Sequence, residues 1–257
     1  MTRAKEYAQT IAGPILLLAI WEGLCRLLNV PAWLLPPPSK ILSEGYEILP
    51  ILPAHLMATL AAILGGFVLS IAVGVPLAIF ITYSPVLRRL IYPAILALQS
   101  VPKVAIAPIL LLWVGYGLKS GIVVAATVAF FPVVISTAAG LESIDRELLE
   151  LTRSLDSGRL KVFLKVRLPW AMPHIFSGLK VAMTLAVIGA IVAEFIGADT
   201  GLGYLILTNS GALKTSVVFF VLLILSLLGI ALFYAVEAVE RIACPWYASN
   251  TMDAEKP

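Results

Sequence analysis

The chain has 257 residues, of which 60% are hydrophobic and only 13% are charged. This composition excludes an ordinary soluble domain and predicts an integral membrane protein. The net charge of +3 is small, and we expect no nucleic acid among its partners. The two cysteines, Cys25 and Cys244, fall in different apolar stretches, so they indicate neither a disulfide framework nor a metal centre.

Six stretches are apolar over about the 20 residues that a helix needs to cross the hydrocarbon of a membrane. They cover residues 11–28, 56–82, 90–115, 122–139, 175–196 and 217–239. The sequence therefore predicts an all-α membrane protein with six transmembrane helices, folded as one domain over residues 1–257. We expect the first helix to be uncleaved, because Arg3 and Lys5 precede it but no small-residue cleavage site follows.

Six spans place both termini on the same side of the membrane. In that arrangement 13 of the 18 Lys and Arg residues lie on the side of the termini and four lie on the opposite side, with Lys103 inside the third span. Positive residues are enriched in cytoplasmic loops. Both termini are therefore predicted to be cytoplasmic.

The first outer loop, residues 29–54, carries six prolines. Its start is predicted to be extended, and residues 39–49 are predicted to form a short helix capped by Ser39. We interpret this loop as a lid or brace on the outer face.

The third span is interrupted near its middle by five residues, which are Gln99, Ser100, Pro102, Lys103 and Pro108. Broken helices in transporters line a path, because the freed backbone groups are tolerated only where protein or water satisfies them. A cation deep in a membrane indicates function by default. We hypothesise that Lys103, together with Gln99, Ser100 and Pro102, lines a path for an anionic substrate. The alternatives are that Lys103 snorkels, pairs with an acid such as Glu194, or lies at an interface because the span is shifted.

Residues 142–169 hold 11 of the 33 charged residues in 28 positions. Each charge in the bilayer core would cost about 2.5–3.5 kcal/mol, so this segment is predicted to protrude into solution. Four apolar residues recur at helical spacing in its first half, which are Ile144, Leu148, Leu151 and Leu155. They predict an amphipathic helix, followed by a turn at residues 156–158 and a second short helix that ends at Pro169 and Pro173.

This helix–turn–helix elbow, within residues 142–173, has two candidate partners. A lipid surface would favour a basic helix with few acids. Here five acids are interleaved with six bases, which favours a protein partner with mixed charges. We therefore expect a docking surface for a protein.

The elbow resembles the EAA loop of bacterial ABC importer permeases, whose pattern is Glu-Ala-Ala, three residues, Gly, nine residues, Ile, one residue, Leu-Pro. The residues at these positions are Glu150, Leu151, Thr152, Asp156, Val166, Leu168 and Pro169, with Arg153 and Gly158 inside the same segment. The spacing matches throughout, although both alanines and the glycine are replaced. Asp tolerates the left-handed backbone that such a turn can need.

Three other stretches resemble the nitrate, sulfonate and taurine branch of these permeases. They read LPPPSKIL, QSVPKVAIAPILLLWVGYG and VAEFIGADTGLGYLI. The resemblance covers most of the chain and implies a type I importer fold in the bacterial cytoplasmic (inner) membrane, in contact with its lipid. It also implies a homodimer, two cytoplasmic ATPase subunits on the elbows, and a periplasmic or lipid-anchored binding protein. The solute would be a small anion such as nitrate, taurine, a sulfonate or an aromatic acid.

The resemblance also implies that ATP and Mg²⁺ bind to the partner ATPase. The sequence contains no G-x-x-x-x-G-K-[ST] phosphate loop, and we expect neither a catalytic site nor a cofactor in this chain. A stand-alone carrier or channel is the alternative, and it would be expected to show intramembrane acids or histidines and usually an internal repeat. A membrane-embedded enzyme would need a nucleophile with its base, or a metal set.

Glu194 lies near the outer end of the fifth span. We hypothesise that it serves as a gate or as a partner for a basic group on the binding protein, the alternative being an interfacial carboxylate. Residues 197–205 contain three glycines, which argues against a good helix and predicts a segment that re-enters or caps the outer mouth. His55 and His174 are interpreted as interfacial polar residues.

Overall fold

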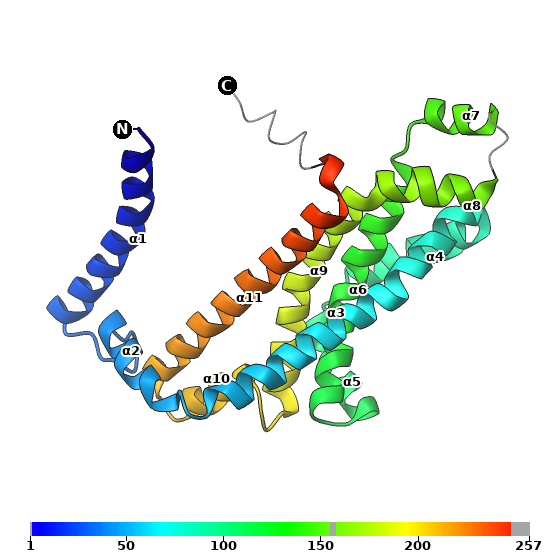
Figure 1. Cartoon of the computed structure of the whole chain (residues 1–257). Helices are drawn as coiled ribbons and strands as arrows, with labels where there is room; N and C mark the ends of the chain where they lie inside the picture. Colours follow the sequence, from blue (N-terminus) through cyan, green and yellow to red (C-terminus); the bar gives the residue numbers. More distant parts are fainter. Residues whose placement is uncertain (1, 155–157, 248–257) are drawn as a thin grey trace.

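The computed structural model describes residues 2–154 and 158–247, and these ranges contain helices but no strand (Figure 1). The α-helices are α1 (Thr2–Leu27), α2 (Pro38–Gly45), α3 (Leu52–Tyr83), α4 (Pro85–Gln99), α5 (Lys103–Val114), α6 (Leu118–Glu142), α7 (Arg146–Ser154), α8 (Arg159–Val162), α9 (Leu168–Gly197), α10 (Leu202–Gly211) and α11 (Thr215–Ala243). A 3₁₀ turn, η1 (Tyr46–Ile48), follows α2, and a π-helical turn, η2 (Phe163–Arg167), joins α8 to α9.

Four helices in the described ranges are long and apolar enough to cross a membrane, which are α3, α6, the continuous helix Leu160–Gly197 that includes α9, and α11. The number rises to five if α4 and α5 are counted as one span, although they are bent by 103° at their break. The predicted all-α membrane fold is confirmed. The count of six is not confirmed, because α1 is not among the four helices and the third predicted span is two helices.

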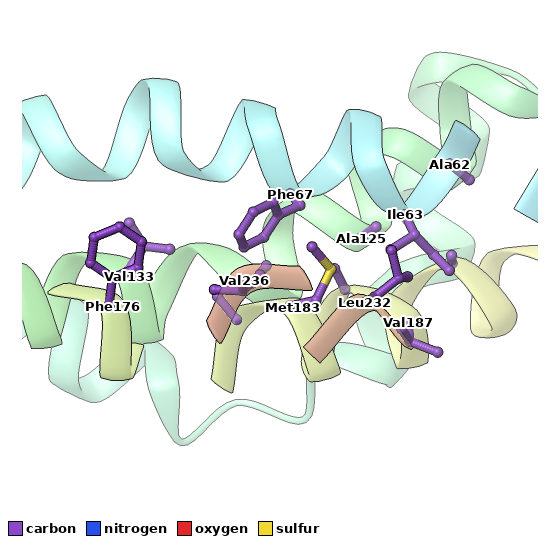
Figure 2. Close-up of a cluster of buried hydrophobic side chains, with 14 of the residues drawn as sticks. Ala62, Ile63, Phe67, Ala125, Val133, Phe176, Met183, Val187, Leu232 and Val236 are labelled. Atoms are coloured by element: carbon purple, nitrogen blue, oxygen red, sulfur yellow. The ribbon is translucent and has the colours of Figure 1, made fainter. Parts of the chain in front are cut away.

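The core lies where α3, α6 and α11 pack around α9. Figure 2 shows side chains from all four helices meeting in one apolar cluster, with Phe67 of α3, Val133 of α6, Met183 of α9 and Val236 of α11 among them. Small residues let the backbones approach closely, as is usual between membrane helices. A Cβ at Gly189 of α9 would lie only 2.7 Å from the Cα of α6 residue Ala125.

The helix α1 stands apart from this bundle (Figure 1). The apolar side chains from Ile15 to Leu18 are exposed, whereas near the end of the helix Trp21 packs against Phe219 of α11 and Cys25 is buried. The loop after α1 returns to the bundle, because the α2 residue Ile41 is buried in a cluster with Phe220 of α11. A Cβ at Gly45 would overlap with the Phe220 ring, so glycine permits this contact.

The prediction that Ser39 caps the helix in this loop is wrong. The helix begins at Pro38, whose fixed φ and missing N–H suit the first helical position. Ser39 lies inside the helix, where its backbone N–H and hydroxyl donate to the Glu22 carboxylate at 3.0 and 2.7 Å. These bonds tie α2 to the end of α1.

The molecule has two distinct ends. Figure 1 shows α7, the start of α1 and the end of α11 at one end, and α2, α5 and α10 at the other. We call these the elbow end and the α10 end. The stretch 197–205, at the α10 end, was predicted not to form a good helix. Only residues 198–201 are non-helical, because α9 continues to Gly197 and α10 begins at Leu202.

Candidate functional site

The first helix of the elbow, α7, lies outside the bundle beyond the ends of α6 and α9 (Figure 1). Ile144 is buried just before it, and Leu148 is half-buried, so one side of the segment contacts the rest of the chain. Glu150 is exposed, and so is Leu151, at 56%. The first arm therefore presents an acidic and an apolar side chain to solution, on a helix outside the bundle.

The residues that match the EAA pattern are distributed over both arms of the elbow. Glu150, Leu151, Thr152 and the backbone of Arg153 belong to α7, and the Thr152 hydroxyl donates to the carbonyl of Leu149 at 2.8 Å. Asp156 lies outside the described residues. In the second arm Gly158 is exposed, while Val166, Leu168 and Pro169 are half-buried.

The second arm does not end at Pro169 and Pro173, as the sequence suggested. It continues into α9 as one helix, Leu160–Gly197. Pro169 has no N–H to donate in an α-helical turn, and the backbone adjusts by a π turn in which the Leu168 N–H donates to the carbonyl of Phe163. The elbow is therefore a direct extension of a membrane helix.

Tyr83, at the end of α3, connects this second arm to the bundle. The guanidinium of Arg167 lies 5.1 Å from the centre of the Tyr83 ring, and the Phe163 ring meets the same ring edge-on at 5.8 Å. Nearby, Arg88 of α4 pairs with Glu142 at the end of α6 at 2.7 Å. The elbow thus contacts the turn between α3 and α4.

A shallow groove of about 340 Å³ lies between the two arms and the segment after α11. Its walls are Leu148, Lys165, Val166, Pro169, Trp170 and Trp246. Two of these residues, Val166 and Pro169, are positions of the EAA-like pattern, so part of the pattern lines a surface depression.

The break between α4 and α5 contains the other predicted group. Lys103 is half-buried, and its ammonium donates to the carbonyl of Gln99 at 3.3 Å and lies 4.7 Å from the centre of the Phe131 ring. That carbonyl would accept from the Lys103 backbone N–H if the helix continued, so the side chain replaces the lost bond. Ser100 and Pro102 are exposed at the same break.

The depth of Lys103 follows from its neighbour. Phe131 lies near the middle of α6, which is long and apolar enough to span the membrane. Lys103 has no carboxylate within ion-pair distance among the residues with described side chains. The structure therefore holds an ammonium group about halfway along α6.

Glu194 lies elsewhere, at the α10 end, and is only 5% exposed. Its carboxylate accepts hydrogen bonds from the hydroxyl of Thr59 and the backbone N–H of Gly203, each at 2.7 Å. His55 is near the same loop and accepts from the N–H of Gly201 at 3.0 Å. One alternative for Lys103 was an ion pair with Glu194, and the structure does not pair them.

Three residues with clear roles in these contacts were not singled out from the sequence, which are Thr59, Tyr83 and Phe131. Thr59 had a usable signal, because a hydroxyl inside a long apolar helix needs a hydrogen-bond partner. Tyr83 and Phe131 gave none, because an aromatic residue in an apolar run is usually part of the core.

Comparison with known proteins identifies the class. The family described as "Binding-protein-dependent transport system inner membrane component" matches residues 70–242. The formylaminopyrimidine transport permease protein ThiX of Halalkalibacterium halodurans is 37% identical over 96% of this chain and 98% of its own. The taurine transport system permease protein TauC of Escherichia coli is 28% identical over 95% of this chain and 91% of its own.

The fold is also that of a solved transporter. A structure of the MetNI methionine ABC transporter in inward-facing conformations aligns with a TM-score of 0.66, at 21% identity, over 77% of this chain and 98% of that chain. The chain therefore belongs to the family of binding-protein-dependent transport system inner membrane components. The predicted class, a permease subunit of an ABC importer, is confirmed.

Proposed function

We propose that two copies of this chain form the membrane-spanning half of an ATP-driven importer and that each elbow binds a cytoplasmic ATPase subunit. The feature that carries the proposal is α7, an amphipathic helix outside the bundle with Glu150 and Leu151 exposed. Its partner arm is continuous with α9. A protein bound at the elbow can therefore move a membrane helix directly.

The remaining partners are proposed from membership of the family. ATP and Mg²⁺ bind to the ATPase subunits, and this chain itself binds no cofactor. A periplasmic or lipid-anchored binding protein delivers the solute to the α10 end. The chain lies in the bacterial cytoplasmic membrane with the elbow end and both termini in the cytoplasm, which the excess of Lys and Arg on that side supports. ATP hydrolysis then drives alternating access.

The translocation path, in this proposal, passes the break between α4 and α5. Lys103 supplies a positive charge about halfway along α6, and Gln99, Ser100 and Pro102 contribute exposed groups of the broken backbone. An ammonium that is half-buried and lacks a carboxylate partner among the described side chains attracts an anion. Rings such as Phe131 leave that charge available, because they interact with it more weakly than a carboxylate does.

The solute is a small anion such as nitrate, taurine or another sulfonate. Lys103 supports this class, as does the similarity to the taurine permease. A second candidate is a neutral heterocycle, because the formylaminopyrimidine permease is 37% identical over nearly its full length. The two candidates differ in whether the solute needs a cation in the path.

Copurification tests the proposed function. A tagged full-length chain, expressed with the ATPase and binding-protein genes of its host, is expected to bring down an ATPase subunit in equal amount. Reconstituted into liposomes with MgATP, the complex is expected to accumulate radiolabelled taurine, with formylaminopyrimidine as the competing probe. Recovery of the intact chain without any ATPase would contradict the proposal.

A further inference from the structure

The α10 end contains a buried cluster of polar side chains, Thr59 and Glu194, among apolar residues. Thr59 of α3 is fully buried, and the Glu194 carboxylate of α9 is 5% exposed. Glu194 helps to line a cavity of about 30 Å³, which has room for one or two water molecules. A carboxylate in such a place is costly unless its oxygens are hydrogen-bonded.

Both oxygens of Glu194 are bonded within the chain, and together they connect three helices. One oxygen accepts from the Thr59 hydroxyl and the other from the Gly203 N–H, both at 2.7 Å. The Thr59 oxygen accepts in turn from the Leu202 N–H at 2.8 Å. Glu194 and Thr59 thus satisfy two free N–H groups at the start of α10, where the helix dipole also favours a negative charge.

The glycines of this loop fit around the carboxylate. Gly201 has a φ of +119°, and a Cβ there would overlap with the Glu194 carboxyl group. A Cβ at Gly203 would lie 2.9 Å from Glu194 Oε2. The sequence GLG therefore gives the carboxylate access to the backbone of the loop.

His55 adds a second link from α3 to the same loop. Its Nδ1 accepts from the Gly201 N–H at 3.0 Å, and its ring stacks on the Tyr204 ring with centres 5.9 Å apart. Three successive N–H groups, those of residues 201–203, are thus bonded to side chains of α3 and α9. The start of α10 is fastened to both helices at once.

We propose that Glu194 is a positioning residue of the transport cycle, which clamps the start of α10 to α3 so that α3, α9 and α10 move as one body and keep the α10 end closed. The inference rests on the proposed function, because closure matters only in a transporter. It gives Glu194 a role inside the chain, in place of direct contact with a solute or a binding protein. Thr59 is the second member of the clamp.

Hydrogen exchange tests the clamp without a solute or an ATPase. Thr59→Val keeps the shape of the side chain but loses the hydroxyl, and Glu194→Gln loses the charge. The amide of Leu202 loses its acceptor in Thr59→Val, and the amide of Gly203 loses its charged acceptor in Glu194→Gln. These amides are expected to exchange faster, by up to about 10- to 100-fold where the lost bond was to a charged group. Thr59→Ser keeps the hydroxyl and should exchange like the wild type. Asp199→Asn removes an exposed charge from the same loop and should also leave exchange unchanged.

A coupling measurement then separates positioning from a merely structural role. In liposomes containing the complete complex, Thr59→Val is expected to lower the amount of taurine imported per ATP hydrolysed about tenfold, while complex assembly and ATP hydrolysis stay near the wild-type level. Thr59→Ser should restore the ratio. Formylaminopyrimidine serves as the probe if the wild type imports that solute instead.

Two results would overturn the proposal. Wild-type exchange of residues 201–203 in both Thr59→Val and Glu194→Gln would mean that these side chains do not hold the loop. Faster exchange with an unchanged coupling ratio would mean that the clamp is only a local brace. A wild-type chain that recruits no ATPase would instead contradict the proposed function, and the exchange measurement would still decide whether the clamp exists.

Discussion

The ion pair between α9 and α11 allows a quantitative test of what stabilises the packing of α9, the helix that continues from the second arm of the elbow. Lys180 Nζ and Glu240 Oε2 are 2.7 Å apart, and the two side chains are only 23% and 12% exposed. The change Lys180→Met removes the ammonium and leaves the Glu240 carboxylate buried. Breaking a buried pair from one side costs about 3–5 kcal/mol, and the partial exposure of Lys180 places this case near the lower value of about 3 kcal/mol.

The double change Lys180→Met with Glu240→Leu should recover most of that loss. It replaces the pair by two apolar side chains of similar volume, a change that is often neutral or stabilising in other proteins, so we expect a loss of no more than about 1 kcal/mol. For a chain of this size, 1 kcal/mol corresponds to about 2–4 °C in the midpoint of thermal unfolding. The single variant should therefore unfold about 6–12 °C below the wild type, and the double variant within about 4 °C of it.

Thermal unfolding of the detergent-solubilised chain, followed by the loss of the folded peak in size-exclusion chromatography, measures these shifts. Glu237→Gln is the matched control, because Glu237 lies one turn earlier on α11 and pairs with the exposed Arg241. Exposed pairs on one helix contribute only about 0.3–0.5 kcal/mol, so this control should hardly move the midpoint. A double variant as unstable as the sum of its two single variants would refute the reasoning.

Three further changes test the function. Lys103→Met should lower the uptake of taurine or nitrate at least about tenfold with the complex intact, whereas Lys119→Met, at an exposed site, should not. Equal uptake by both variants would rule out Lys103 as a path residue. Glu150→Lys should weaken recovery of the ATPase about tenfold, and Glu47→Lys, exposed at the α10 end, should leave recovery normal. Tyr83→Leu removes the ring contacts to the elbow, worth about 1–2 kcal/mol, and should lower uptake per ATP while ATPase binding persists.

The long apolar helices could be predicted from the sequence because hydropathy alone identifies them. The helices α3, α6, α9 and α11 each overlap a predicted span, and the break before Lys103 follows from Pro102. The position of α1 apart from the bundle could not be predicted, because the apolar residues of a helix do not specify which neighbouring helix it packs against. The start of α2 was missed because Ser39 was preferred over Pro38, although proline is favoured at a first helical position.

The candidate site, like the fold, has parts that local sequence predicts and parts that it does not. The charges of the elbow lie together in the sequence, so the exposure of Glu150 and the other described acids followed from local composition. The Glu194 clamp joins residues that are 135 positions apart, and no local pattern connects them. The glycines after Glu194 were interpreted as helix breakers, whereas their lack of a Cβ lets the carboxylate reach the loop. Such a role depends on a partner that one sequence does not reveal.

The helix α9 links the two ends of the molecule. Its 30 residues extend about 45 Å, from Leu168 and Pro169 of the EAA-like pattern to Glu194 of the clamp. Gly189 keeps its backbone against α6, where any side chain would push the two helices apart. Because the packed interface between α9 and α6 allows little deformation, a force on one end of α9 should tilt the whole helix and not bend it locally. A displacement of the elbow by a bound ATPase would therefore reach the clamp through one element, and the α10 end would respond without a separate signal.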